Sequence, residues 1–383
     1  MLMSVDINLL LSIALLLVVA KVFGEIAERL KTSSLVGEII AGIVMGPVLK
    51  LVTPEPILAQ IAGFGIIFSM FIIGLDTKFD EKSNIYSGSI IAIISCGLLF
   101  IAGFFVGYLV FGNILIGVIL GIAILSSSTL IALRSLTDIG ELHSPAGKFL
   151  LIVEMADEVI AILMLALLTS FLTFGKIDVW NASALFFAIL GFFLFIIKFG
   201  TKAVGKFLTL FQTARDEQML VSIPLFIVFI VAFVSEHVGV AAVTGAFLAG
   251  MAMSRSPVTQ PIIIPKMKTI GYGFFIPLFF AYSAIMLDLG MLISSLWIVL
   301  VLLVLVIVIN LISGYASGYF GFSNKEKKII GIGLIPRGEY SIIIAQIALT
   351  VSAITIQFYG VIISFVLLSI IITPLFLRFL RQK

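Results

Sequence analysis

Three carboxylates lie close together in an otherwise apolar stretch of this sequence. Glu154, Asp157 and Glu158 fall inside a run that predicts one long helix over about 145–173. At positions i, i+3 and i+4 their side chains project from one face of that helix. One charge at the centre of a bilayer costs roughly 2.5 to 3.5 kcal/mol on insertion scales, so three there indicate a functional site that faces water or a countercharge.

These acids suit the binding of both protons and cations. Adjacent buried carboxylates repel one another and are poorly solvated, which favours a proton on at least one of them. The same oxygens are ligands for a hard cation such as Na+. We therefore expect a hard cation such as Na+ to bind at Asp157 and Glu158, with no cofactor.

Two polar interruptions fall inside other apolar runs. One is a hydroxyl run that ends in Ser127, Ser128 and Thr129, and the other is Pro336-Arg337-Gly338-Glu339. Each can break a helix in mid-span, and the half-helix ends then offer a positive dipole and free carbonyls to an ion. We expect the three hydroxyl residues to join the cation site and Glu339 to have a structural role.

Less specific explanations exist for each of these groups. Glu154 would be only the structural partner that neutralises Arg337, the one cation predicted within a span. Asp157 and Glu158 would be solvated charges at a helix end. The hydroxyl run would be side chains that bond back to their own helix.

The composition predicts an all-α polytopic membrane protein. Hydrophobic residues make up 61% of the 383 residues, charged residues 11%, and the mean hydropathy is +1.30. Soluble domains do not have this composition. The single cysteine, Cys96, excludes a disulfide framework. The first apolar run lacks a basic n-region, so we expect a retained helix rather than a signal peptide.

Thirteen apolar runs come close to the ~20 residues that a helix needs to cross a bilayer. They lie at about 7–23, 35–52, 57–75, 85–111, 114–133, 145–173, 184–204, 219–235, 240–253, 270–287, 291–319, 328–349 and 354–379.

The basic residues support this count and give an orientation. All but three of the 23 Lys and Arg residues lie in the loops after odd-numbered spans, at nearby span ends or in the C-terminal tail. The three exceptions are Lys50, Lys176 and Arg337. Because Lys and Arg collect on the cytoplasmic side, we expect a cell-membrane protein with its N-terminus outside and its C-terminus in the cytoplasm.

Weak internal matches predict two repeats of opposite topology. Residues 37–45 resemble 245–253, Leu75-Asp76 resembles Leu287-Asp288, and 126–129 align with 336–339, each at an offset of about 210 residues. Seven spans separate each pair, so the halves are inverted and the two broken helices cross near the midplane. We expect a first repeat at 1–180, a linker span and basic loop at 181–215, and a second repeat at 216–383.

Over nearly its full length the chain resembles the second family of monovalent cation:proton antiporters, the Kef-type and related sodium/proton exchangers. The similarity lies in 37–47, in Ser127-Ser128-Thr129, in 336–339 and in the paired acids Asp157-Glu158. The resemblance implies a core domain that moves against a dimerisation domain, a homodimer in membrane lipid, and exchange of sodium or potassium for protons. We expect Na+/H+ exchange, with a Kef-like K+/H+ antiporter or K+ efflux pathway as the alternative.

The chain departs from the family pattern at two places. Glu158 stands where relatives have the ion-binding aspartate, which leaves either Asp157 or Glu158 as the principal ligand. Asn310 stands where charge-moving relatives have a lysine. Because Asn310 cannot release a proton, we expect one-for-one electroneutral exchange.

Two other functional classes fit less well. A channel would need a continuous pore and does not explain titratable acids at mid-depth. An intramembrane enzyme would need a catalytic constellation, and the spans hold no His-Glu-x-x-His, Gly-x-Gly-Asp or serine-histidine pair. No feature indicates nucleic-acid binding.

Overall fold

The computed structural model describes residues 7–30, 32–76, 85–174, 191, 218–237, 242–254, 263–287, 290, 293 and 295–381. Throughout these ranges the secondary structure is helical, which confirms the predicted all-α class. Six of the described helices are long and apolar enough to cross a membrane. The predicted linker at 181–215 falls outside the described residues except for one position.

The helices follow the predicted spans closely. They are α1 (Ile7–Arg29), α2 (Ser34–Ile43), α3 (Pro56–Asp76), α4 (Ile85–Phe111), α5 (Ile114–Leu125), α6 (Thr129–Ile139), α7 (Pro145–Phe174), α10 (Met219–His237), α11 (Ala242–Ser254), α12 (Ile264–Ile270), α13 (Ile276–Ile285), α15 (Leu296–Ala316), α16 (Asn324–Gly333), α17 (Glu339–Thr350) and α18 (Ile356–Arg381). Short π-helical turns at Val44–Val48 and Gly271–Phe275 extend α2 and join α12 to α13.

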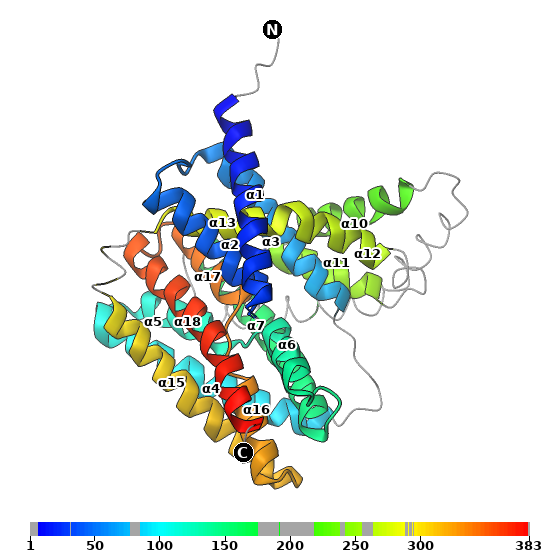
Figure 1. Cartoon of the computed structure of the whole chain (residues 1–383), viewed down its shortest axis with the longest axis vertical. Coiled ribbons are helices and arrows are strands. Elements are labelled where there is room, and N and C mark those ends of the chain that lie inside the picture. The colour runs from blue at the N-terminus through cyan, green and yellow to red at the C-terminus, as the bar shows by residue number, and fades with distance from the viewer. Residues whose placement is uncertain are drawn as a thin grey trace.

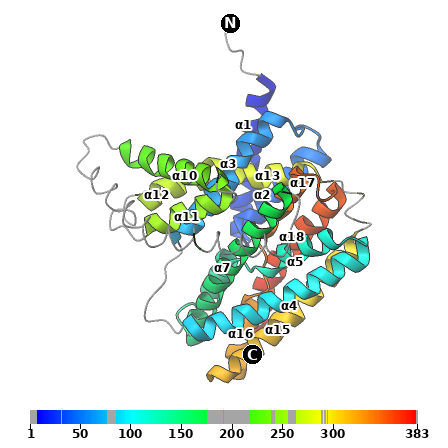
Figure 2. The same cartoon turned by 180° about the vertical axis from the view of Figure 1, so that it is seen from behind.

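The helices form two groups, visible in the upper and lower halves of Figures 1 and 2. In the first group, α1, α2, α3, α10, α11, α12 and α13 pack on one another, and in the second α4, α5, α6, α7, α15, α16, α17 and α18 do so. We call them the first and second bundles. They meet where α7 contacts α11 and where α18 contacts α2.

Glycines permit the closest helix contacts within the first bundle. A Cβ atom at Gly42 of α2 would lie 2.0 Å from the carbonyl oxygen of Ala281 in α13. In the contact of α3 with α11, a Cβ at Gly250 would lie 2.1 Å from the carbonyl oxygen of Phe71. Only glycine fits at such backbone approaches, so these residues are packing positions, as membrane helices commonly use them.

Both predicted interruptions break their helices. α5 ends at Leu125 and α6 begins at Thr129, while α16 ends at Gly333 and α17 begins at Glu339. The two breaks meet, because the Ser128 amide donates a hydrogen bond to the Pro336 carbonyl over 2.8 Å. Backbone groups freed by one break are thus partly satisfied by the other.

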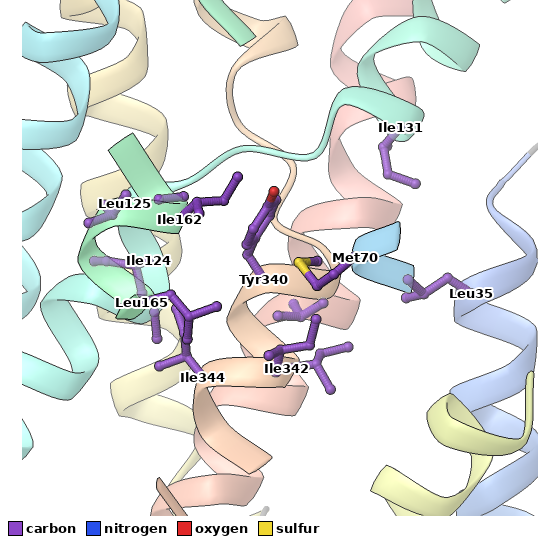
Figure 3. Packing of buried hydrophobic residues seen from close by; sticks show 14 of the residues in the cluster. Leu35, Met70, Ile124, Leu125, Ile131, Ile162, Leu165, Tyr340, Ile342 and Ile344 are labelled. Carbon is purple, nitrogen blue, oxygen red and sulfur yellow. The ribbon is translucent and has the colours of Figure 1, made fainter. Parts of the chain in front are cut away.

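Helix α17 lies in the middle of the largest apolar cluster. Figure 3 shows Tyr340 and Ile344 of α17 facing Leu125 of α5 and Leu165 of α7 on one side, with Met70 of α3 on the other. The second break is therefore held between both bundles.

Candidate functional site

The three acids of α7 are buried in the middle of the helix. Glu154, Asp157 and Glu158 have exposed fractions of 0%, 4% and 8%. They lie well inside Pro145–Phe174, so the interpretation of Asp157 and Glu158 as solvated helix-end charges is wrong. Carboxylates this deep require polar partners, and the two breaks provide them.

Asp157 is held by three hydrogen bonds. Its Oδ2 accepts from the Ser127 amide over 2.7 Å and from the Ser127 hydroxyl over 2.5 Å. Its Oδ1 accepts from the Cys96 thiol of α4 over 2.8 Å. The serine therefore bonds across to α7 rather than back to its own helix. Sequence reasoning missed Cys96, because an apolar helix gives no signal for which face meets the acid.

Thr129, the first residue of α6, connects the two glutamates. Its hydroxyl lies 2.6 Å from Glu158 Oε1 and 3.1 Å from Glu154 Oε2. A hydroxyl has one hydrogen to donate and can accept a second hydrogen bond. The Thr129 hydroxyl is satisfied as donor and as acceptor when one glutamate accepts from it and the other, protonated, donates to it. This geometry can store a proton beside Asp157.

Arg337 is fully buried in the second break without a direct ion pair. Its amide donates to the Ser369 hydroxyl over 2.9 Å, while its Nε and Nη2 atoms have no hydrogen-bond partner. Within the described part of the chain no carboxylate lies within 4.0 Å of its guanidinium, and Glu154 Oε1 is also unpartnered. The predicted pairing of Arg337 with Glu154 is therefore not a direct contact among the described residues.

Glu339 faces the first break from the start of α17. It is buried, and Ser128 Oγ lies 3.5 Å from its Oε2, at the limit of a hydrogen bond. Its place in the first helical turn favours a negative charge through the helix dipole. All three predicted hydroxyl residues therefore contact acids.

Asn310 of α15 does not contact the acid cluster. Its Oδ1 accepts from the Ser95 hydroxyl of α4 over 2.8 Å, and its buried Nδ2 has no partner. Ser95 precedes Cys96 in the chain, so adjacent residues of α4 contact Asn310 and Asp157.

A cavity of about 50 Å³ leads from the two breaks into the space between the bundles. Ser128 and Glu339 line it from the second bundle, and Glu38, Ser69 and Tyr272 line it from the first. A water needs roughly 10 to 15 Å³ of such space, so the cavity has room for water or a partly hydrated cation beside Glu339.

Two ion pairs lie on the first-bundle side of this cavity. Lys21 lies 3.7 Å from the buried Glu38 and also donates to the backbone carbonyl of Tyr272. Lys268 lies 2.7 Å from Asp76 at the end of α3. Both acids thus have a basic partner within the first bundle, which indicates a structural role for them.

The described residues contain no group of three or more His, Cys, Asp and Glu side chains placed to share one metal ion. The donors around Asp157 are hydroxyl and carboxylate oxygens from α6, α7 and the first break. Oxygen donors of mixed charge suit a weakly held hard cation, which has to leave again during transport.

Comparisons with known proteins agree with this chemistry. A family model described as "Sodium/hydrogen exchanger, transmembrane" matches residues 13–383. The Na(+)/H(+)-K(+) antiporter GerN of Bacillus cereus is 31% identical over 96% of this chain and 95% of its own length. The Na(+)/H(+) antiporter of Enterococcus hirae is 26% identical over 97% of both chains.

A solved structure supports the fold. The sodium proton antiporter MjNhaP1 of Methanocaldococcus jannaschii superposes with a TM-score of 0.69 at 16% identity, covering 98% of this chain and 99% of that one. The resemblance to monovalent cation:proton antiporters is confirmed, although relatives named as sodium/proton antiporters describe it better than the Kef-type label does.

Proposed function

Because the chain belongs to the sodium/hydrogen exchanger family, we propose that it exchanges Na+ for H+ by competition at Asp157 and Glu158. It is a secondary antiporter, since the gradient of one ion drives the other. The observation that carries the proposed site is the set of contacts between the first break and α7, where Ser127 binds Asp157 and Thr129 binds Glu158.

In this mechanism Na+ displaces protons from the acid cluster. Hydroxyl and carboxylate oxygens replace part of the hydration shell of the ion, and carbonyls of the breaks complete it. The proton between Glu154 and Glu158 leaves through the Thr129 hydroxyl when the cation takes its place. Proton and cation cannot both be held, so each crossing of the membrane carries one or the other.

Alternating access requires relative movement of the two bundles. The cavity beside Glu339 lies between them and gives one route to the site. We propose that the second bundle, which holds both breaks and all three acids, moves against the first as a core domain. We also propose that residues 1–180 and 216–383 are inverted repeats, joined through 181–215, and that each repeat contributes helices to both bundles.

We propose that the chain works as a homodimer in the cell membrane, with its C-terminus in the cytoplasm. The distribution of Lys and Arg supports the orientation. Asn310 lies away from the acids and has no titratable group, which supports electroneutral exchange.

Potassium is the second candidate cation. GerN is named as a Na(+)/H(+)-K(+) antiporter, and a K(+)/H(+) antiporter subunit of Bacillus subtilis, KhtU, is 24% identical over 89% of this chain. The oxygen donors of the site do not discriminate by charge between the two ions.

Proteoliposomes test the proposal directly. A pH dye inside the vesicles, with an imposed proton gradient, should report proton movement on addition of Na+ or Li+, and less on addition of K+. The Asp157→Asn and Glu158→Gln variants should give no signal. Wild-type exchange in both variants would remove these acids from the site, and a K+ response above the Na+ response would assign K+ as the substrate.

A further inference from the structure

A second cavity, of about 440 Å³, lies between the two bundles away from the acids. One wall is the C-terminal part of α1 with the start of α2, and the other wall is the C-terminal part of α18. The described residues that line it are apolar apart from Thr32. The walls include Phe23, Ile26 and Ile40 from the first bundle and Ile371, Pro374 and Leu375 from the second.

The surroundings of this cavity determine what can fill it. α1 and α18 are both long and apolar enough to cross a membrane. Leu30 and Leu375 line the cavity and are also exposed at the protein surface, so the cavity opens outward between the two helices. Water does not fill an apolar space of this kind, and its volume lies within the roughly 300 to 1,000 Å³ of ligand sites. In a bilayer the available apolar ligand is a lipid acyl chain.

One end of the cavity has a polar group that lacks a partner. The Thr32 hydroxyl, in the connection between α1 and α2, is buried and has no hydrogen-bond partner among the described residues. A buried hydroxyl that lacks a partner costs free energy, and an ester or phosphate oxygen of a lipid would satisfy it. The apolar cavity thus suits the acyl chain of a phospholipid, and the Thr32 hydroxyl suits an oxygen of its ester or phosphate groups.

The sequence at the same end has more basic residues than acidic ones, even with Glu25 and Glu28 included, and Arg29 itself pairs with Glu25. Arg29 is the last residue of α1, three positions before Thr32, and its side chain is 78% exposed. Lys31 separates them in the sequence, and Arg378 and Arg381 lie in the last turns of α18. Basic side chains at a membrane surface attract anionic headgroups. The charge of this end therefore favours an anionic lipid over a zwitterionic one.

We propose that this cavity is a binding site for an anionic phospholipid, with an acyl chain between α1, α2 and α18 and the headgroup at Thr32. The lipid contacts both bundles at once. It therefore stabilises the bundle arrangement that has this cavity over any arrangement that closes it. The effect on transport rests on the proposed function, whereas the binding of the lipid does not.

Native mass spectrometry of the delipidated protein, titrated with phosphatidylglycerol or phosphatidylcholine, tests the site. A Leu375→Trp variant fills the cavity from an exposed position, and Leu300→Trp on α15 is its control, because the two leucines are 47% and 48% exposed. Wild type and Leu300→Trp should bind phosphatidylglycerol about fivefold more tightly than phosphatidylcholine, the ratio expected for one basic side chain near the headgroup. Leu375→Trp should lose this tight binding.

A Thr32→Val variant tests the headgroup end, since valine keeps the shape and removes the hydroxyl. It should keep acyl-chain binding and bind phosphatidylglycerol severalfold more weakly than wild type. Equal binding by Leu375→Trp and Leu300→Trp overturns the site, and equal affinity of the wild type for the two lipids overturns the anionic headgroup. Na+/H+ exchange is measured on the same preparations, which separates the lipid-site proposal from the proposed function. If the protein binds the lipid but does not exchange Na+ for H+, only the proposed function is contradicted.

Discussion

At the scale of single residues, Asp157 is the point where separate elements meet. The Ser127 amide and hydroxyl fix one carboxylate oxygen, and the Cys96 thiol fixes the other. A thiol is a weak donor that leaves the oxygen able to bind a cation. Cys96 thus contacts Oδ1 of Asp157, and a cation at this oxygen has to bind beside the thiol or displace it.

Replacing Cys96 should change cation affinity rather than maximal rate. In Cys96→Ala the Asp157 oxygen loses its donor, so a cation no longer competes with the thiol, and the apparent KM for Na+ should fall severalfold with little change in maximal rate. Ser95→Ala is the control on the same helix, because Ser95 bonds to Asn310 instead. An apparent KM for Na+ that stays at the wild-type value in Cys96→Ala would show that the thiol contact has no influence on the site.

Arg337 and Glu154 should be coupled energetically although they do not touch. Both are fully buried with unpartnered polar atoms, so removing either charge leaves the other uncompensated. Arg337→Gln should lower the thermal midpoint in detergent far more than Arg29→Gln, whose surface pair is worth ~0–1 kcal/mol.

The double variant Glu154→Gln, Arg337→Gln measures the coupling itself. It should recover part of the loss, with an interaction of about 0.5–3 kcal/mol. Strictly additive effects would mean that Glu154 has a role apart from Arg337.

At the scale of elements, the function depends on how closely the two breaks approach. A Cβ atom at Gly338 would lie 2.6 Å from the Ser128 Oγ atom and 2.8 Å from its Cβ. Gly338 therefore sets the distance between the breaks, and through Ser128 and Glu339 it sets the shape of the site.

Gly338→Ala should reduce exchange severely while the protein stays folded. The added methyl group separates the breaks and displaces Ser128, whereas Gly97→Ala in α4 meets nothing within 4 Å and serves as the control. Exchange rates in proteoliposomes and thermal midpoints in detergent check both effects. Full activity in Gly338→Ala would show that the contact between the breaks tolerates change.

The start of α16 is stabilised by a capping box whose strength depends on pH. The Ser323 hydroxyl accepts from the Glu326 amide, and the Glu326 carboxylate accepts from the Ser323 amide over 2.8 Å. Hydrogen bonding of the Glu326 carboxylate to Ser323, above all from the Ser323 amide, lowers the pKa of Glu326, which lies outside the predicted span. Because the folded pKa is below the unfolded one, the stabilisation is complete above the ordinary value of about 4.3 and is lost as pH falls through the folded pKa.

Glu326→Gln should therefore flatten the loss of thermal stability below about pH 4.3. Ser323→Ala should lower stability by about 0.5–2 kcal/mol at neutral pH, as loss of an N-cap does. Melting curves of the three proteins between neutral and acid pH check this. If all three lose stability in parallel on acidification, the capping box contributes nothing to the pH dependence.

Particular elements show which features of the fold and the site could be predicted from the sequence. The bounds of α4 were predictable to the residue, because an uninterrupted apolar run between polar ends determines both limits. Both breaks were predictable, because hydroxyl and Pro-Arg-Gly-Glu runs interrupt a helical ladder. The contact of Cys96 with Asp157 was not, since α4 is apolar on every face and its rotation depends on packing against α5 and α7. The distance between Arg337 and Glu154 depends on the same tertiary packing.

At the scale of the whole molecule, the two bundles explain how one site can serve two sides of a membrane. The second bundle holds the acids and both breaks, and the first forms the opposite wall of the cavity beside Glu339. α18 contacts α2 and lines the proposed lipid site, while Glu339 of α17 lines the cavity beside the breaks. The proposed movement of the bundles would therefore change both places. Cation affinity, proton affinity and the bundle arrangement are therefore linked.

The central claim is that Na+ and H+ compete for one site formed by Asp157 and Glu158. The most direct measurement is the initial rate of exchange in proteoliposomes as a function of Na+ concentration at several pH values. Competition with one proton predicts that the apparent KM for Na+ rises up to about tenfold for each unit that pH falls, while the maximal rate at saturating Na+ stays constant. Asp157→Asn should show no Na+-dependent rate at any pH. A KM that is independent of pH, with a maximal rate that falls on acidification, would contradict competition and place the proton on a separate site.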